Sequence, residues 1–216
     1  MPDASTSNAP AAQIPVSPNN PCPFLRAMVA EGYVGGHIVP LSELCRLIEA
    51  ASGEQGVKKT IVGAAIYLVA LVANGLGPLR VIKSATSGAV LDELRDGTFD
   101  KHGGGSRILD ATANVHMDQI ERFAGFGKDC KDPDGGTERG LTAKEIDVFL
   151  DANMERDGDS AKFYYPLFMK GEWPFLLKIL GKGEGEARYL SVAEVLTLFV
   201  ERRLPDRIVA RLKASG

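Results

Sequence analysis

The chain has 216 residues, of which 44% are hydrophobic and 25% are charged, as in ordinary globular proteins. This length suits one domain with its own core. The formal net charge is −3 and the basic residues are scattered, so nucleic acid is not an expected partner. Three cysteines cannot all pair within one chain, and the three histidines lie far apart, so neither a disulfide framework nor a zinc cluster is expected.

Residues 1–19 differ in composition from the rest of the chain, because they are rich in proline, alanine, serine and asparagine. They lack the basic and apolar regions of a signal peptide. We therefore expect a flexible or loosely draped arm, followed by a single domain over 20–216, in a cytoplasmic protein. The longest uncharged run, 61–73, falls short of the roughly 18–20 residues that span a bilayer, so no membrane partner is expected.

The first predicted helix follows the sequence Pro21-Cys22-Pro23. Pro23 suits the first turn of a helix, and Gly32 suits the position just after its end. Cys22 then lies at the N-cap, where free N–H groups and the helix dipole favour a thiolate. Such a thiolate can be a nucleophile, a redox centre or a metal ligand. The alternative is a small buried thiol between two prolines.

Further helices are predicted along the chain from apolar spacing, capping residues and glycine stops. Residues 76–106 give the weakest signal for secondary structure. The polar loop at 129–139 and the polar segment at 151–155 lack the glycine and glutamate spacing of a calcium-binding loop. No convincing strand alternation appears, so the predicted class is all-α. The expected helices cover 42–51 with Ser42 as N-cap, 61–73, a short piece at 90–95, a segment from about 110 that buries Ile120 and Phe123, 142–154, 171–180 and 191–199.

The N-terminal pattern Pro-Cys-Pro, then Phe-Leu-Arg-Ala, then Gly-Tyr, resembles the proximal loop and helix of the haem-thiolate peroxidases. That family includes the chloroperoxidases and the unspecific peroxygenases. The resemblance implies a compact, single-domain helical fold of the chloroperoxidase type that binds haem b. It also implies that Cys22 is the axial ligand of the haem iron, and that Pro21, Pro23, Phe24 and Leu25 shape the proximal pocket.

The C-terminal half carries a second, looser resemblance to the same family. Gly171-Glu172 precedes an apolar helix, and Phe199 is later followed by the sequence Glu-Arg-Arg-Leu-Pro at 201–205. By this resemblance, Glu172 is the acid–base group that moves a proton between the two oxygens of peroxide. The alternative is a glutamate in the first turn of a helix, stabilised by the helix dipole.

The family's Glu-His-Asp motif is the poorest match. Its best local counterpart is His116-Met117-Asp118, in which His116 replaces the cation-binding glutamate and no serine follows. A divalent cation beside a haem propionate is therefore not expected. His116 is a candidate partner of Glu172 or a haem-contacting group, and the alternative is a structural histidine.

The resemblance as a whole predicts a peroxide-dependent oxidoreductase that oxidises or oxygenates a small organic substrate with hydrogen peroxide. One alternative is a haem protein without peroxygenase activity, such as a sensor or carrier. The other is a haem-free helical interaction protein on the same scaffold. The aromatic residues that are candidates for the substrate wall, each of them otherwise an ordinary core residue, are Phe163, Tyr164, Phe168, Trp173 and Phe175.

Overall fold

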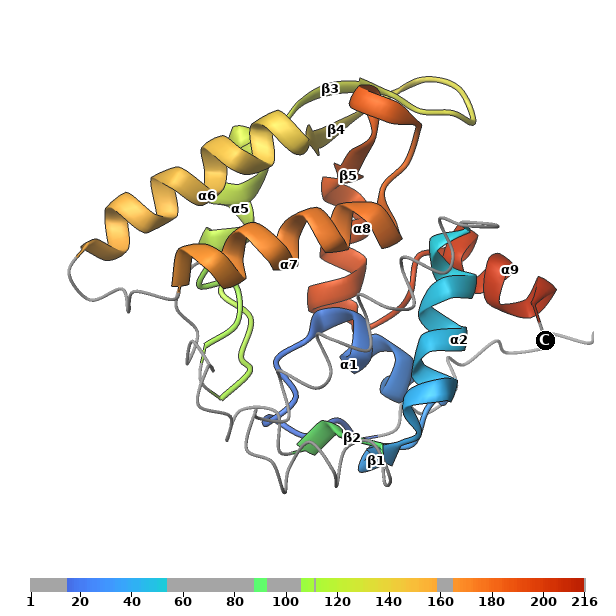
Figure 1. Cartoon of the computed structure of the whole chain (residues 1–216). Helices are drawn as coiled ribbons and strands as arrows, with labels where there is room; N and C mark the ends of the chain where they lie inside the picture. The colour runs from blue at the N-terminus through green and yellow to red at the C-terminus, as the bar shows by residue number, and fades with distance from the viewer. Residues whose placement is uncertain (1–14, 54–87, 93–105, 111, 159–164, 216) are drawn as a thin grey trace, which may run out of the picture.

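A computed structural model describes residues 15–53, 88–92, 106–110, 112–158 and 165–215, with the backbone alone described over 165–169 (Figure 1). The helices are α1 (Pro23–Ala30), α2 (Leu41–Ser52), α5 (Met117–Phe126), α6 (Ala143–Asp157), α7 (Tyr165–Leu180), α8 (Val192–Leu196) and α9 (Asp206–Ala214), with a π-helical segment η4 (Thr197–Glu201) after α8. The strands are β1 (Ile38–Val39), β2 (Ala89–Val90), β3 (Lys128–Lys131), β4 (Thr137–Thr142) and β5 (Tyr189–Ser191).

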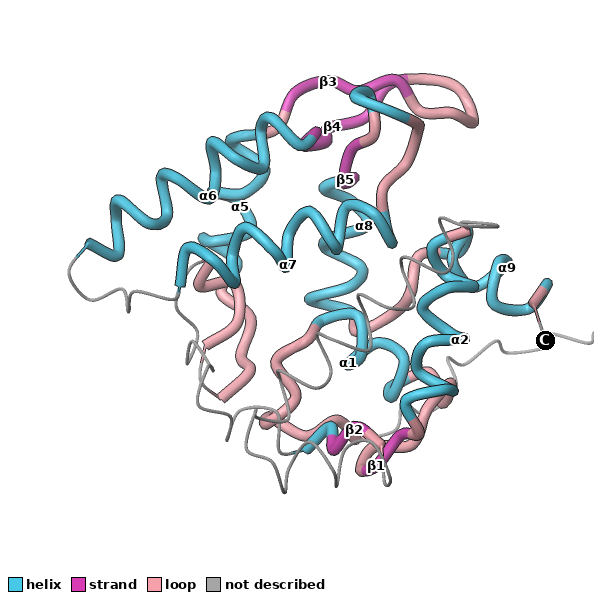
Figure 2. The backbone as a smooth tube through the Cα atoms, in the orientation of Figure 1, coloured by secondary structure: helices cyan, strands magenta, loops and turns pink. Residues whose placement is uncertain are grey.

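The all-α prediction is wrong, because these strands form two antiparallel sheets (Figure 2). One sheet has the order β3-β4-β5, and the other pairs β1 with β2. The two sheets lie at opposite ends of the molecule, with the helices between them (Figure 1). The chain is therefore a mixed α and β protein in which most of the described backbone is helical.

The β3–β4 hairpin occupies the segment that the sequence predicted to be a polar loop. Cys130 is the one buried residue of β3, and the other β3 side chains face solvent. Gly135 and Gly136 turn the chain with φ values of 105° and 89°, which residues with a side chain adopt rarely. Since an exposed edge strand needs no apolar alternation, its sequence gave no strand signal.

The predicted ends of the first two helices agree with the structure. Gly32 follows α1 with φ 77°, and the Tyr33 N–H bonds to the Met28 carbonyl, as in a Schellman ending. Gly53 ends α2 in the left-handed region with φ 67°. The start of α2 differs from the prediction, because Pro40 rather than Ser42 is the N-cap.

The predicted starts of α5 and α7 both differ from the structure. α5 begins only at Met117, because Asp110 Oδ1 accepts the N–H groups of Thr112 and Asn114 before it in a non-helical arrangement. α7 begins at Tyr165 and continues through Gly171 and Pro174, so the predicted start at 171 is wrong. In the predicted 90–95 helix, Val90 belongs instead to β2. The predicted helix at 61–73 lies outside the described residues.

Helix α1 lies in the interior, since every residue from Phe24 to Ala30 is buried. Next to it, α7 packs against both α6 and α2. An aromatic cluster joins α5, α6 and α7: Phe123 stacks on Trp173 at 5.2 Å between ring centroids, and Phe149 meets both rings edge-on at 5.3 Å. These rings are fully or nearly fully buried, and their packing fixes the rotation of α7 about its axis. Among the described helices, none combines the length and the apolar character needed to span a membrane.

We expect Thr142→Ala to lower the free energy of unfolding by about 1 kcal/mol, the usual cost of losing an N-cap. Thr142 caps α6, and its hydroxyl and backbone N–H both donate to Glu145 Oε2. Ser42→Ala is the matched control, because Ser42 lies exposed inside the first turn of α2 and is not its cap. Urea unfolding measures both variants, and equal losses in the two would contradict the assignment.

Glu145 should also contribute to stability in a pH-dependent way. Burial raises the pKa of Glu145, but hydrogen bonds from Thr142 and Lys128 outweigh it and lower the pKa to about 2 from 4.5. A carboxyl whose pKa is lowered by folding stabilises the protein above its unfolded pKa, and this contribution is lost as the pH falls from 4.5 toward 2. Urea unfolding of Glu145→Gln across this range should lack that loss. Glu155→Gln, at an exposed position of α6, should keep it.

Candidate functional site

The site predicted around Cys22 lies at the start of α1. Cys22 is the N-cap with an extended backbone, φ −78° and ψ 113°, and its carbonyl accepts the Arg26 N–H at 2.9 Å. Pro21 and Pro23 flank it, half-buried, while Phe24 and Leu25 point into the core. The predicted proximal residues therefore form one continuous turn around the cysteine.

Two effects act in opposite directions on the pKa of the Cys22 thiol. The residue as a whole is half-buried, but protein encloses its sulfur, and this burial raises the pKa of the thiol. The backbone N–H groups of Leu25 and Phe24 act in the opposite direction, as expected at a helix start, but more weakly. Burial thus has a larger effect than the helix start that was predicted to favour a thiolate. Without a bound cation, Cys22 is therefore a neutral thiol at pH 7. A thiolate here requires a partner that compensates for the buried charge.

A buried polar clamp holds the segment before Cys22. Arg26 is 7% exposed, and its Nη1 donates to the carbonyls of Ser17 at 3.3 Å and Asn20 at 3.2 Å. The Asn20 side chain is 1% exposed, and its Oδ1 accepts the Cys22 N–H at 3.2 Å. Its Nδ2 is buried without a hydrogen-bond partner. A buried donor left unpaired costs stability, so the position fits an acceptor that binds beside Cys22.

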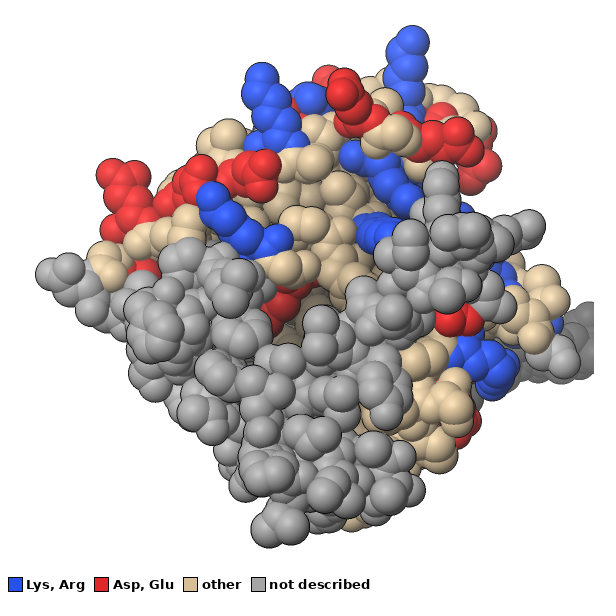
Figure 3. Space-filling view, in the orientation of Figure 1, with Lys and Arg blue, Asp and Glu red and all other residues tan. Residues whose placement is uncertain are grey.

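Glu172 comes to the same place from α7, far along the chain. Its charge acts on Cys22, where it raises the pKa of the thiol, so the carboxylate and the sulfur lie within electrostatic reach. Glu172 is exposed, whereas its neighbour Trp173 is buried, so the Glu172 side chain lies beside the buried face of α7, about 100° around the helix from Trp173. Because α7 begins at Tyr165, Glu172 lies in the middle of the helix, and the first-turn alternative is wrong. Figure 3 shows a hollow between the positions of α7 and α1, with acidic atoms at its edge.

His116 lies in a different setting from the one predicted. It is the N-cap of α5, and its side chain is half exposed. Its Nε2 is 3.5 Å from Asp110 Oδ2, and its charge also acts on Asp118. These interactions belong to the turn that starts α5, and they support the structural alternative. A catalytic role for His116 stays a prediction.

The aromatic residues predicted to line the substrate site do not all have the same outcome. Trp173 belongs to the aromatic cluster of the core, and Phe175 is partly buried against the same core. Phe163, Tyr164 and the side chain of Phe168 lie outside the described residues. For Trp173 the ordinary core interpretation is therefore the correct one.

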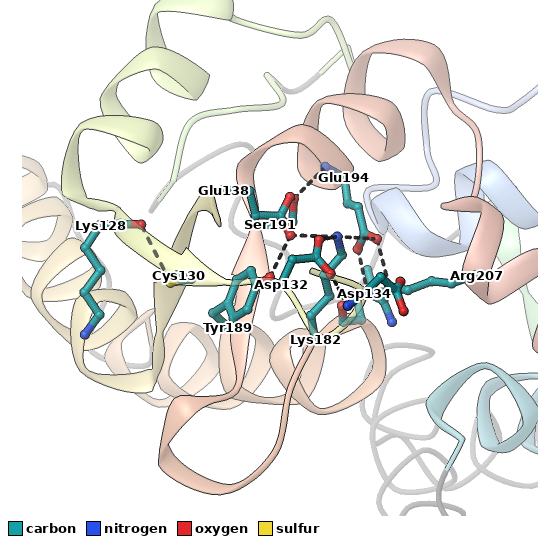
Figure 4. Close-up of polar contacts among 11 residues, drawn as sticks. Lys128, Cys130, Asp132, Asp134, Glu138, Lys182, Tyr189, Ser191, Glu194 and Arg207 are labelled. Carbon is teal, nitrogen blue, oxygen red and sulfur yellow. Dashed lines mark hydrogen bonds and ion pairs between the residues drawn. The ribbon is translucent and has the colours of Figure 1, made fainter. Parts of the chain in front are cut away.

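A second polar cluster, which the sequence analysis missed, surrounds Lys182 next to the three-stranded sheet (Figure 4). Lys182 Nζ lies 2.8 Å from Asp132 Oδ2 and 2.6 Å from Glu138 Oε1. Glu138 also accepts the hydroxyl hydrogens of Tyr189 and Ser191, both at 2.7 Å. These bonds tie the hairpin to β5 and to Lys182. The signal in the sequence was weak, because its members come from separate polar segments.

Among the residues that the structure describes, no group of three or more histidine, cysteine or acidic side chains is arranged to hold a metal ion. A haem iron needs only one protein ligand, and the residues around Cys22 fit that role. The sulfur lies at a helix start and two backbone N–H groups face it. The Asn20 side chain accepts the Cys22 N–H, and its own Nδ2 is buried without a hydrogen-bond partner. Comparisons with protein-family models, with curated proteins and with solved structures found no significant match to this chain.

Proposed function

We propose that the protein is a haem-thiolate oxidoreductase that uses hydrogen peroxide to oxidise or oxygenate a small organic molecule. The observation that carries the proposal is the proximity of the Cys22 sulfur and the Glu172 carboxylate, which come from opposite ends of the chain. This proximity supports the roles that the family resemblance gives to the two residues, axial ligand and acid–base group. The N-terminal Pro-Cys-Pro pattern supports the same function.

Cys22 would hold the haem iron, and the turn from Pro21 to Leu25 would shape the surface on the sulfur side. A thiolate-ligated haem supplies an electron-rich iron that favours cleavage of the O–O bond. The Leu25 and Phe24 N–H groups would stabilise the thiolate once iron displaces its proton. The Arg26 guanidinium also favours the anion, and its bonds to the carbonyls of Ser17 and Asn20 keep the turn closed.

Glu172 would act as the acid–base group. Heterolytic cleavage of the peroxide O–O bond needs a base that takes a proton from one oxygen and delivers it to the other. The Glu172 carboxylate can do both, since its side chain is exposed and acts electrostatically on Cys22. Glu172 lies in the middle of α7, and the packing of Trp173 holds this helix in place. The position of the carboxylate that carries the proton is therefore fixed.

Replacement of Cys22 tests the ligand directly. In protein expressed with a haem supply, reduced and treated with carbon monoxide, we expect Cys22→Ala to abolish the thiolate-type absorption band. Cys45→Ala and Cys130→Ala are matched controls that should keep it, since both lie in other parts of the fold. Survival of the band in Cys22→Ala would move the ligand elsewhere, and a wild-type protein without a Soret band would favour the haem-free alternative.

Replacement of Glu172 tests the acid–base role. We expect Glu172→Gln to retain haem and to slow the reaction with peroxide by about 10²–10⁴-fold, the range typical of proton-transfer groups. Glu186→Gln removes an exposed carboxylate near β5 and should leave the rate unchanged. Stopped-flow absorption measures both variants. An unaltered rate in Glu172→Gln would remove this residue from the mechanism, and haem binding without turnover of any donor would favour a sensor or carrier.

A further inference from the structure

The turn that carries the proposed ligand has a single backbone donor. Proline has no N–H group, so the Cys22 N–H is the only main-chain donor in the sequence Pro21-Cys22-Pro23. The Asn20 side chain accepts it, with 3.2 Å between Oδ1 and the Cys22 nitrogen. The Cys22 carbonyl accepts the Arg26 N–H at 2.9 Å, as the first bond of α1. Both polar groups of the Cys22 backbone are therefore held, one by a side chain and one by the helix.

Asn20 is itself firmly placed. The residue is 1% exposed, and its backbone N–H donates to the Ser17 carbonyl at 3.2 Å. Its own carbonyl accepts Arg26 Nη1 at 3.2 Å, and the same Nη1 reaches the Ser17 carbonyl. The Asn20 side chain cannot move away from Cys22 without disturbing these buried bonds. Its Oδ1 is thus an acceptor with a fixed position, and so is the N–H group that it holds.

This anchoring determines where the Cys22 sulfur lies. Once both ends of the Cys22 backbone are held, the Cα–Cβ bond has one direction, and Sγ can occupy only a few staggered positions around it. The position adopted brings the sulfur to the backbone N–H groups of Phe24 and Leu25 at the start of α1. A ligand atom that is placed before its partner arrives loses less freedom on binding, which favours the bound state.

The neutral charge of Asn20 also matters for the sulfur. Asparagine and aspartate can both accept an N–H group two residues further along the chain, so this hydrogen bond alone does not require asparagine. A carboxylate at position 20, however, would add a negative charge beside Cys22 and oppose the thiolate that iron needs. Asn20 is neutral, and in the described part of the chain its buried Nδ2 has no hydrogen-bond partner. Asn20 therefore holds the turn without opposing an anion there.

We propose that Asn20 is a positioning residue for the Cys22 thiolate: its side-chain oxygen holds the Cys22 backbone so that the sulfur meets the iron in a fixed direction. This role rests on the proposed function, because iron is the partner that the sulfur would meet. Asn20 precedes the Pro-Cys-Pro pattern, and the family resemblance gives it no role. It acts through Cys22 and touches neither the iron nor the peroxide.

Hydrogen exchange tests the contact in the full chain without added haem. Isotopically labelled cysteine gives one amide signal for each of the three cysteines, and the signal lost in Cys22→Ala identifies Cys22. Asn20→Ala should speed exchange of the Cys22 amide by about tenfold or more, the effect of losing one hydrogen bond. Asn20→Asp keeps the acceptor oxygen and should keep the protection. Asn19→Ala, at the exposed neighbouring asparagine, is the matched control and should exchange as the wild type does.

The haem-loaded protein tests the consequence for the iron. Asn20→Ala should lose part of the thiolate-type band of the reduced, carbon-monoxide-treated protein, because the sulfur is no longer held in one direction. Asn20→Asp should keep the band and lower the reduction potential of the iron, because a nearby negative charge stabilises the oxidised state. A purely structural residue would not shift the potential in this way. Asn19→Ala should keep both the band and the potential.

Circular dichroism confirms that each variant is folded, and Asn20→Asp carries the test where Asn20→Ala does not fold. Unchanged exchange of the Cys22 amide in Asn20→Ala would overturn the positioning role. So would an unchanged band in Asn20→Ala together with an unchanged potential in Asn20→Asp, and either result leaves the proposed function standing. A wild-type protein without a Soret band would instead refute the proposed function, and the role of Asn20 toward iron with it.

Discussion

The packing of Trp173 between Phe123 and Phe149 is the constraint on which the candidate site depends. These three buried rings come from α7, α5 and α6, and they fix which side of α7 faces the core. Glu172 precedes Trp173 in the same helix, so burying the indole places the carboxylate about 100° around the helix, at the edge of the buried face. That edge lies within electrostatic reach of Cys22. A core contact thus decides the position of the proposed acid–base group.

Around Cys22 two opposing effects decide the state of the sulfur. A helix start stabilises an anion, whereas enclosure by protein destabilises it, and here enclosure has the larger effect. The buried Arg26 is held by the carbonyls of Ser17 and Asn20, so it belongs to the structure of the turn. The Nδ2 of Asn20 is buried without a hydrogen-bond partner, and a donor in this state costs free energy. Under the proposed function, an acceptor bound at this turn would satisfy that donor.

Local signals predicted local structure well. Helix ends were predictable where residues close in sequence determine them, as with the proline and glycine around α1, the glycine after α2 and the capping residues of α6. The sheets were missed because β3 is exposed and polar, so its pairing with β4 depends on the turn and on contacts across the chain. The start of α7 was misplaced because Gly171 and Pro174 suggest a boundary, although tertiary packing carries the helix through both. Cys22 was identifiable from its motif, but its proximity to Glu172 depends on the three-dimensional fold.

The most direct test of the account is X-ray absorption at the iron edge of the protein produced with a haem supply. The account predicts one sulfur atom in the first shell of the iron, and its disappearance in Cys22→Ser with haem still bound. A first shell of nitrogen and oxygen alone in the wild type would contradict it, because the iron would then be held by a residue other than Cys22.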